Sequence, residues 1–329
     1  MSKQEHHETE STSERPTQTG AEAAIEALEA AGVEMIFGVQ GGAIMPVYDA
    51  LFHSDLRHVT MAHEQGAAHA ADAYGVVRNG PGVCMATSGP GATNLVTGIA
   101  DANMDSDALV ALTGQVPSGM VGSDAFQETD TMGVTTPLTK HNYFTHTADD
   151  VGAAVGEAVA LSTQGRFGPT LIDLPKDATN ASTSVETPPP TPPATTVPQR
   201  LAPGASVAAA ADAIAAAQRP LLLFGGGVIT ADATDIGRTF ARAYEIPVVT
   251  TMPGIGSFPE DDPLALSWAG MHGTGYANMA ITHTDCLIAV GTRFDDRLTG
   301  GVETFAPEAT VVHIEIDPAE VSKNIHADI

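Results

Sequence analysis

Positive charge is scarce in this sequence of 329 residues. It holds 14 Lys and Arg against 40 Asp and Glu, which gives a formal net charge of −26 at pH 7, and its lysines are Lys3, Lys140, Lys176 and Lys323. This negative field repels phosphate groups, so we expect no nucleic acid and no anionic membrane as a partner. The acids are spread along the chain, a pattern typical of a halophilic protein, whose self-repulsion is screened in concentrated salt.

Cysteine and long apolar runs are also lacking. Cys84 and Cys286 each sit in an apolar run, which predicts two buried, reduced thiols and excludes a disulfide framework. No apolar stretch reaches the roughly 20 residues that cross a bilayer. Residues 1–18 have no apolar core, so we expect a disordered polar tail and no signal peptide. These absences predict a cytoplasmic protein.

What the sequence does have is an alternation of short apolar runs and helical patterns. Thr19 and Glu22 have the spacing of a capping box at the start of a helix. Such alternation predicts an α/β protein with parallel sheets covered on both faces. Before the middle of the chain we expect five strands, at residues 33–39, 57–62, 82–88, 108–113 and 170–174. After it we expect four, at residues 220–224, 246–251, 285–290 and 310–316.

A proline-rich stretch divides the chain. Residues 177–204 include ETPPPTPPATTVPQ, and proline at this density favours a semi-extended linker. We therefore expect one domain over residues 19–176 and another over residues 205–329. The smaller number of strands after the linker predicts a second, doubly wound sheet that is incomplete.

Four polar or glycine-rich features follow predicted strands, where parallel sheets bind ligands. The first is Glu64, at the start of a predicted helix. A carboxylate there commonly stabilises the helix dipole, and alternatively it holds a cofactor nitrogen. The nearby histidines His58, His63 and His69 lack the HExxH spacing, which argues against zinc.

The other three features are also ambiguous when each is taken alone. The segment from Ser88 to Asn94, SGPGATN, fits a ligand-binding turn or an ordinary tight turn. The triplet Gly225–Gly227 permits a close approach of a dinucleotide but lacks the GxGxxG spacing. The segment from Arg293 to Arg297, RFDDR, fits phosphate or ribose contacts or a solvated loop of ion pairs. Their shared position after strands favours binding.

At these residues the chain closely resembles the acetolactate synthase large-subunit family of thiamine diphosphate enzymes, from about residue 21 to residue 329. The motifs that carry the resemblance are FGVQGGAIMPVYDAL, AHEQGAAHAADAYG, CMATSGPGATNLVTGIADANMDS, TGQVP, SDAFQETD, TKHN, LIDLPKD, GMHGTGYAN, GTRFDDRLTG and HIEIDPAE. The resemblance implies a pyrimidine-binding domain followed by a Rossmann-like FAD-binding domain. It also implies decarboxylation of pyruvate and transfer of the two-carbon unit to a second 2-oxo acid, an early step towards isoleucine and valine.

The resemblance also implies roles for individual residues. Glu64 would hydrogen-bond N1′ of the thiamine aminopyrimidine, and Gln127 and Phe126 would flank the reaction centre. Lys176 resembles a lysine of the substrate channel. The loop residues Gly41, Gly42 and Ala43, with Ser88 and Asn94, would line the cofactor. The positions implied for a structural FAD are Arg166, Gly225, Gly226, Gly227, Thr251, Met252, Gly270, Met271, His272, Gly273, Gly291, Thr292, Arg293, Phe294, Asp295, Asp296, Arg297, Glu315 and Asp317.

The chain departs from the family pattern in three places. Gln40 stands where the family usually has proline, and Ser118 and Gly119 follow TGQVP where an arginine is common. The third departure is the absence of the GDG…N motif, which in the family binds Mg²⁺ and the diphosphate from a third, C-terminal domain.

The family forms homodimers or homotetramers whose active site lies between subunits, and a regulatory small subunit binds some members. Without the third domain we expect this chain alone to be inactive, as a fragment, as part of a split enzyme or as a relic. The alternatives are a non-catalytic flavin- or nucleotide-binding module and a related enzyme such as pyruvate oxidase. RFDDRLTG and GMHGT argue against pyruvate oxidase, and Glu64 argues against glyoxylate carboligase.

Overall fold

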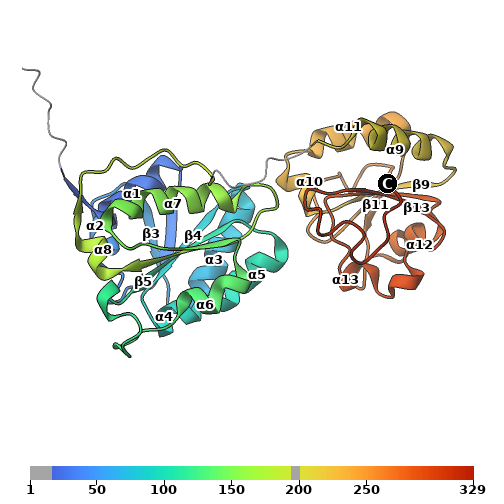
Figure 1. The fold of residues 1–329 in the computed structure, drawn as a ribbon. Coiled ribbons are helices and arrows are strands. Elements are labelled where there is room, and N and C mark those ends of the chain that lie inside the picture. The colour runs from blue at the N-terminus through green and yellow to red at the C-terminus, as the bar shows by residue number, and fades with distance from the viewer. Residues whose placement is uncertain (1–16, 194–200) are drawn as a thin grey trace, which may run out of the picture. The chain divides into compact units, whose positions relative to one another are not determined.

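Two parallel sheets organise the computed structural model, which describes residues 17–193 and 201–329 (Figure 1). Residues 17–193 belong to one compact unit and residues 201–329 to another. Every strand pair in these two sheets is parallel. The predicted fold class is therefore confirmed.

The first unit holds a six-stranded sheet in the order β3-β2-β4-β5-β7-β6. Its strands are β2 (Met35–Gly38), β3 (Arg57–Thr60), β4 (Gly82–Ala86), β5 (Leu109–Gln115), β6 (His141–Phe144) and β7 (Thr170–Pro175). Its helices are α1 (Gly20–Ala30), α2 (Met45–Phe52), α3 (Glu64–Arg78), α4 (Pro90–Asn94), α5 (Val96–Asp105), α6 (Thr131–Thr135), α7 (Ala148–Ser162) and α8 (Lys176–Asn180). The predicted capping box begins α1, with the Glu22 amide donating to Thr19 Oγ1 over 3.1 Å and the Thr19 amide donating to Glu22 Oε2 over 2.6 Å.

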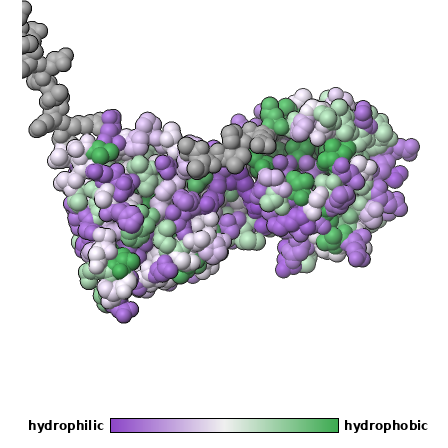
Figure 2. All heavy atoms as spheres, viewed as in Figure 1, coloured by the Kyte–Doolittle hydropathy of each residue, from purple (hydrophilic) through white to green (hydrophobic). Residues whose placement is uncertain are grey.

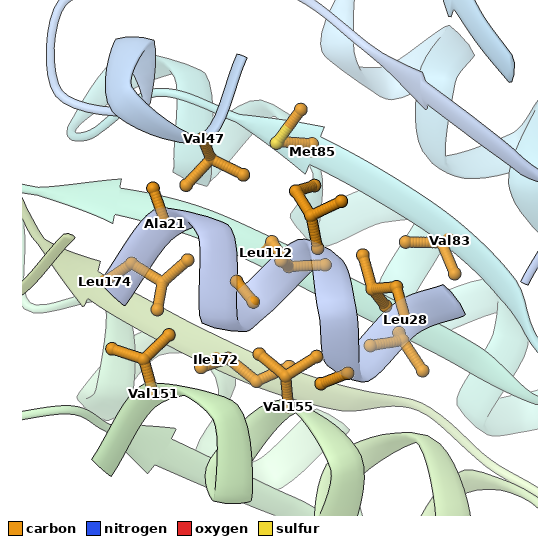
Figure 3. Packing of buried hydrophobic residues seen from close by; sticks show 14 of the residues in the cluster. Ala21, Leu28, Val47, Val83, Met85, Leu112, Val151, Val155, Ile172 and Leu174 are labelled. Carbon is orange, nitrogen blue, oxygen red and sulfur yellow. The ribbon is translucent and has the colours of Figure 1, made fainter. Parts of the chain in front are cut away.

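The core of this unit lies on both faces of the sheet, because successive residues of a strand point in opposite directions. Val110 and Leu112 of β5 pack with α1, α2 and α7 (Figure 3). Leu109 and Ala111 pack on the other face with α3 and α5. The uninterrupted apolar runs of the sequence thus reflect strands buried on both sides.

The second unit holds a five-stranded sheet in the order β11-β10-β9-β12-β13. Its strands are β9 (Pro220–Phe224), β10 (Val248–Thr250), β11 (Ala265–Trp268), β12 (Cys286–Val290) and β13 (Thr310–Ile314). Its helices are α9 (Gly204–Ala216), α10 (Gly226–Thr230), α11 (Thr234–Tyr244), α12 (Gly275–His283) and α13 (Asp296–Thr299). Buried clusters lie on both faces, one with α12 and α13 and one with α10 and α11.

The strand count differs from the prediction in both units. The sequence predicts five and four strands, whereas the sheets have six and five, so each predicted count is one strand too low. The additional strands are β6 and β11, and each lies at a sheet edge. Edge strands are half solvated, and the sequences HNYF and ALSW carry neither a long apolar run nor a clear alternation.

The segment expected to be a linker begins later than predicted. Residues 177–180 complete α8, and β8 (Ser182–Thr183) pairs antiparallel with β1 (Gln18–Thr19). After β8, Thr187 Oγ1 donates to Glu26 Oε2 of α1 over 2.6 Å, and this hydrogen bond holds Thr187 against α1. The linker prediction is therefore wrong for these residues, because hydrogen bonds attach them to the first unit. Residues 194–200, and residues 1–16 of the expected tail, lie outside the described residues.

No helix within residues 17–193 or 201–329 combines the length and the hydropathy that a transmembrane span requires. Cys84 and Cys286 are both buried with free thiols, as predicted.

Candidate functional site

The order in which the chain adds strands to the first sheet reverses between β2 and β4, and the carboxyl ends of these two strands mark this point. After β2 the chain adds β3 on one side of it, and after β3 it crosses over to add β4 on the other side. Open parallel sheets bind ligands at such points, because the loops that leave the two strands diverge. The loop with Gly41, Gly42 and Ala43 follows β2, and Ser88 follows β4. The topology therefore brings two of the predicted segments to one edge.

Glu64 is the first residue of α3, at this same edge. The helix begins there because His63 is its N-cap, with Nδ1 accepting from the Gln65 amide over 3.1 Å. Asn94 Nδ2 donates to Glu64 Oε2 over 3.0 Å, so the SGPGATN segment holds the half-buried carboxylate. No hydrogen bond from the described residues reaches Glu64 Oε1. One carboxylate oxygen is thus fixed and the other is available to a ligand.

Thr87 connects the two loops around Glu64. Its Oγ1 accepts from the Ala43 amide over 3.2 Å, and a Cβ on Gly41 would collide with its side chain. A Cβ on Gly91 would lie 2.7 Å from Thr87 Cγ2 and 3.5 Å from Glu64 Oε1. The glycines therefore let both loops pack closely against Thr87 beside the carboxylate. The sequence analysis missed Thr87, although a polar residue directly after an apolar strand is a usable signal.

Gln127 is brought to this region through its backbone. Gly89, with φ of 57°, packs against the Gln127 carbonyl, and a Cβ there would collide with it. Gln127 itself has φ of 58°, and its side chain is exposed. Phe126 is 87% exposed. The loop that holds both residues is closed by Glu128, which accepts from the amides of Gly122 and Ala125.

A buried network of polar side chains on β5 and β7 lies next to the loop that holds Gln127. Asp173 on β7 accepts from Thr113 Oγ1 over 2.7 Å and from Gln115 Nε2 over 2.9 Å. Gln115 Nε2 also donates to the carbonyl of Thr129 over 3.1 Å, next to the Gln127 loop. Sequence reasoning missed this network, for which an acid inside the apolar strand TLIDLP is the signal.

Burial raises the pKa of Asp173 to about 6, although the hydrogen bonds from Thr113 and Gln115 lower it in part. The folded protein therefore binds more protons here than the unfolded chain between pH about 4 and about 6, so this carboxyl destabilises the fold as pH rises through that window. Asp173→Asn removes the titration. We expect its stability relative to wild type to improve by on the order of 2 kcal/mol from pH about 4 to about 7.

Urea denaturation of both proteins, followed by circular dichroism at the two pH values, measures this difference. Any change in hydrogen bonding that the amide causes is present at both pH values, so only the change with pH tests the prediction. A pH-independent difference would contradict it.

Two further features of the first unit lie near its loops. Lys176 is half-buried and directly follows β7, at the carboxyl edge of the sheet. Gln40 Nε2 donates to Thr60 Oγ1 over 3.0 Å, and Ser118 Oγ donates to Asp177 Oδ2 over 2.5 Å. Gln40 and Ser118, which depart from the family pattern, therefore each hold a loop in place.

In the second unit, the order in which the chain adds strands to the sheet reverses in the same way between β9 and β12. The Gly225 amide donates to the Val290 carbonyl over 2.9 Å, and the Gly227 amide donates to the Gly291 carbonyl over 3.1 Å. A Cβ on Gly225 would collide with the Gly291 carbonyl, and one on Gly227 would lie 2.7 Å from Gly291 Cα. The predicted segments Gly225–Gly227 and Gly291–Arg297 are therefore in direct backbone contact. Gly226 starts α10 beside this contact.

The RFDDR segment also meets a predicted partner. The Met271 amide donates to the Arg297 carbonyl over 2.7 Å, which brings the Gly270–Gly273 turn against this loop. Asp295 caps α13 by accepting from the Arg297 and Leu298 amides. Arg293 lies 3.7 Å from Asp295, and Arg297 lies 3.7 Å from Asp296. His272 and Met271 are exposed on the turn.

The remaining predicted positions divide into accessible and buried groups. Met252 is exposed after β10, whereas Thr251 and Thr292 are buried. Phe294 is 1% exposed and packs edge-on against Phe305 and His313, so its ring belongs to the core and not to a ligand surface.

Two acids and one arginine complete the predicted positions. Glu315 follows β13, where its Oε1 accepts from the Ile316 and Asp317 amides. Asp317 in turn accepts from the Ala319 amide. Arg166 belongs to the first unit, in the loop before β7, where its Nε donates to Ser106 Oγ over 2.8 Å. It therefore lies at the amino edge of its sheet, opposite to Glu64.

Comparison with known proteins gives matches in both units. The N-terminal TPP binding domain of thiamine pyrophosphate enzymes matches residues 18–134, and the central domain of these enzymes matches residues 207–329. A protein named acetolactate synthase large subunit from Parasynechococcus marenigrum is 51% identical over 327 residues, which are 95% of this chain and 52% of that protein. A probable acetolactate synthase large subunit from Methanocaldococcus jannaschii is 50% identical over 94% of this chain and 53% of its own length.

An acetolactate synthase from Mycobacterium bovis is 51% identical over 94% of this chain and 50% of its own length. The chain therefore spans about half the length of the curated relatives that it matches.

Proposed function

The chain belongs to the thiamine pyrophosphate enzymes, and from this premise we propose that it acts as part of the catalytic large subunit of an acetolactate synthase. The reaction would be decarboxylation of pyruvate and transfer of the two-carbon unit to a second 2-oxo acid. Pyruvate as acceptor gives 2-acetolactate, and 2-oxobutyrate gives 2-aceto-2-hydroxybutyrate, both precursors of branched-chain amino acids. The observation that carries the proposal is Glu64, held by Asn94 beside the glycine-lined surface of Thr87.

The residues of this edge fit the aminopyrimidine ring of thiamine diphosphate. Gly41 and Gly91 let the two loops pack closely on Thr87, which would keep the backbone beside Glu64 within reach of a flat heteroaromatic ring. The ring also needs an acceptor for its protonated nitrogen, and Glu64 Oε1 has no hydrogen bond from the described residues. When bound, thiamine diphosphate supplies the nucleophilic carbon and the electron sink for decarboxylation.

The contribution of the chain itself is proton handling and positioning. Glu64 Oε1 would accept a hydrogen bond from N1′ of the ring and hold the proton there, while Asn94 keeps the carboxylate oriented. The Gln127 backbone beside Gly89 would bring Gln127 and Phe126 near the reacting atoms. Lys176, one of few cations in an acidic chain, would attract the carboxylate of the 2-oxo acid.

The second unit would hold FAD. Where Gly225, Gly227 and Gly291 meet, the absence of side chains would let a pyrophosphate approach the backbone closely, and the Gly226 amide at the start of α10 would face it. The Gly270–Gly273 turn and the Arg293–Arg297 loop would line the cofactor, and Glu315 would face its distal end. We assign FAD a structural role, so no electron transfer enters the reaction.

Mg²⁺ and the diphosphate would be held by residues outside these 329, since the GDG motif that resemblance assigns to them is absent from the sequence. We accordingly propose a homodimer or homotetramer with the active site between subunits. The relatives carry the name large subunit, which supports a regulatory small subunit as a further partner.

Identification of the products formed from pyruvate tests the function. An assembly that contains this chain should release carbon dioxide and 2-acetolactate when thiamine diphosphate and Mg²⁺ are supplied. Formation of acetate or acetyl phosphate with consumption of oxygen would instead assign a pyruvate oxidase. Flavin binding without any product would leave the non-catalytic module as the function.

We also propose that the protein is halophilic. Hydrophilic residues cover much of the face shown in Figure 2, and the net charge is −26. Repulsion between these charges is screened in 1 M salt, where the Debye length is about 3 Å. We expect the melting temperature, measured by differential scanning calorimetry, to rise from low to multimolar KCl. A melting temperature that stays constant or falls would contradict this proposal.

A further inference from the structure

Helices α3 and α5 approach each other closely on one face of the first sheet. A Cβ on Gly98 of α5 would collide with the Ala68 methyl and would lie 3.3 Å from the His69 amide nitrogen. Only glycine permits this contact. Asp101 lies one turn after Gly98 on α5, so the close approach brings its side chain to His69 of α3.

Three side chains converge at this contact. His69 Nδ1 lies 3.2 Å from Asp101 Oδ2. Asp72, one turn after His69 on α3, adds a carboxylate oxygen, and the three ligand atoms lie within 4.8 Å of one another. Among the described residues this is the one group of three or more His, Cys, Asp or Glu side chains with such mutual distances. Donor atoms bound to one ion at about 2.0–2.2 Å lie at most about 4.4 Å apart, so a displacement of a few tenths of an ångström would let all three bind one ion.

Of the three residues, Asp72 is the one that is buried with a carboxylate oxygen that lacks a partner within the described residues. The residue is 9% exposed, and its Oδ1 is buried without a hydrogen bond. The charges of Asp107, Asp101 and Asp105 add to the cost of burying Asp72 as a carboxylate. No Lys or Arg among the described residues pairs with Asp72. A buried carboxylate surrounded by other carboxylates is costly unless a cation or a proton neutralises it.

We propose that His69 Nδ1, Asp72 and Asp101 bind a divalent first-row transition metal ion that joins α3 to α5. One imidazole and two carboxylates favour Zn²⁺ or Mn²⁺ over Mg²⁺ and Ca²⁺, which prefer oxygen ligands throughout. Water would complete the coordination sphere, because His69 and Asp101 are partly exposed.

Binding of the ion would restrain the position of α3. Glu64 begins the helix that carries His69 and Asp72, so the ion would fix α3 against α5. This role does not depend on acetolactate synthesis, and the site is separate from the Mg²⁺ expected to bind the diphosphate.

Isothermal titration of the metal-free full chain with ZnCl₂ and with MnCl₂ tests the proposal. We expect one site per chain and a rise in melting temperature with metal concentration, since the ion binds only the folded state. Asp72→Asn and His69→Gln should each weaken binding at least about tenfold and reduce the rise in melting temperature at the same metal concentration. Asp72→Asn keeps the shape of the side chain, and circular dichroism of both metal-free variants reports whether they fold.

Two controls separate this site from adventitious binding. His53→Gln removes an exposed histidine at the end of α2 and should leave the affinity unchanged. His6→Gln combined with His7→Gln removes the adjacent histidines near the N-terminus and should also leave it unchanged. Binding that is lost in this double variant but retained in His69→Gln would overturn the proposal. So would the absence of a site for either metal, or the same affinity in Asp72→Asn as in wild type.

Discussion

Replacing Glu64 with Gln should slow acetolactate formation by about 10²–10⁴-fold in an active assembly, the range typical of groups that transfer or hold a proton. The variant keeps the length of the side chain, and its amide oxygen still accepts from Asn94 Nδ2. It loses the negative charge at Oε1, which in our proposal stabilises the proton on the cofactor ring. The rate of acetolactate release from pyruvate, at saturating cofactor, measures this loss.

Glu34→Gln is the matched control for that experiment. Glu34 is exposed, pairs with Arg78 over 2.6 Å and precedes β2 at the amino edge of the sheet. Surface pairs of this kind contribute little, so we expect its activity to stay within about twofold of wild type. A loss of less than about threefold in Glu64→Gln would remove this carboxylate from the mechanism.

Replacing Gly225 with Ala should disrupt the second unit. The new methyl group would collide with the Gly291 carbonyl, and both segments are fixed by backbone hydrogen bonds between Gly225, Val290, Gly227 and Gly291. Relief requires the carboxyl ends of β9 and β12 to separate, at a cost of about 2–3 kcal/mol or more. In our proposal the same movement deforms the FAD site, so the purified variant should retain little flavin.

Trp268 provides the measurement for this variant. It is the single tryptophan of the chain and lies in β11, so its fluorescence reports unfolding of the second unit. Gly204→Ala is the control, because nothing lies within 4 Å of a Cβ at this position at the start of α9. We expect the control to unfold like wild type and to keep its flavin. Equal stability of the two variants would contradict the geometry of the Gly225–Gly291 contact.

The sequence predicted the buried elements well because their signals are local. The strand PLLLF is continuous and apolar, and it appears as β9 with the predicted bounds. The Thr19–Glu22 capping box is likewise a contact between residues three apart. Glu64 was predicted at a helix start and is found there, because His63 supplies the N-cap.

The features that the sequence did not predict depend on contacts between distant residues. The role of Thr87 depends on Ala43, which is 44 residues away, and Asp173 binds Thr113, which is 60 residues away. The strands β6 and β11 owe their conformation to a neighbouring strand and not to their own apolar pattern. Phe294 lies within a polar motif, and only the folded second unit shows that its ring packs against Phe305 and His313.

A crystal structure of the assembly with thiamine diphosphate bound tests the central claim most directly. Our account predicts a hydrogen bond of about 2.6–3.2 Å between Glu64 Oε1 and N1′ of the aminopyrimidine, with Asn94 still donating to Oε2. A ring bound elsewhere, or a Glu64 carboxylate turned away from N1′, would contradict it.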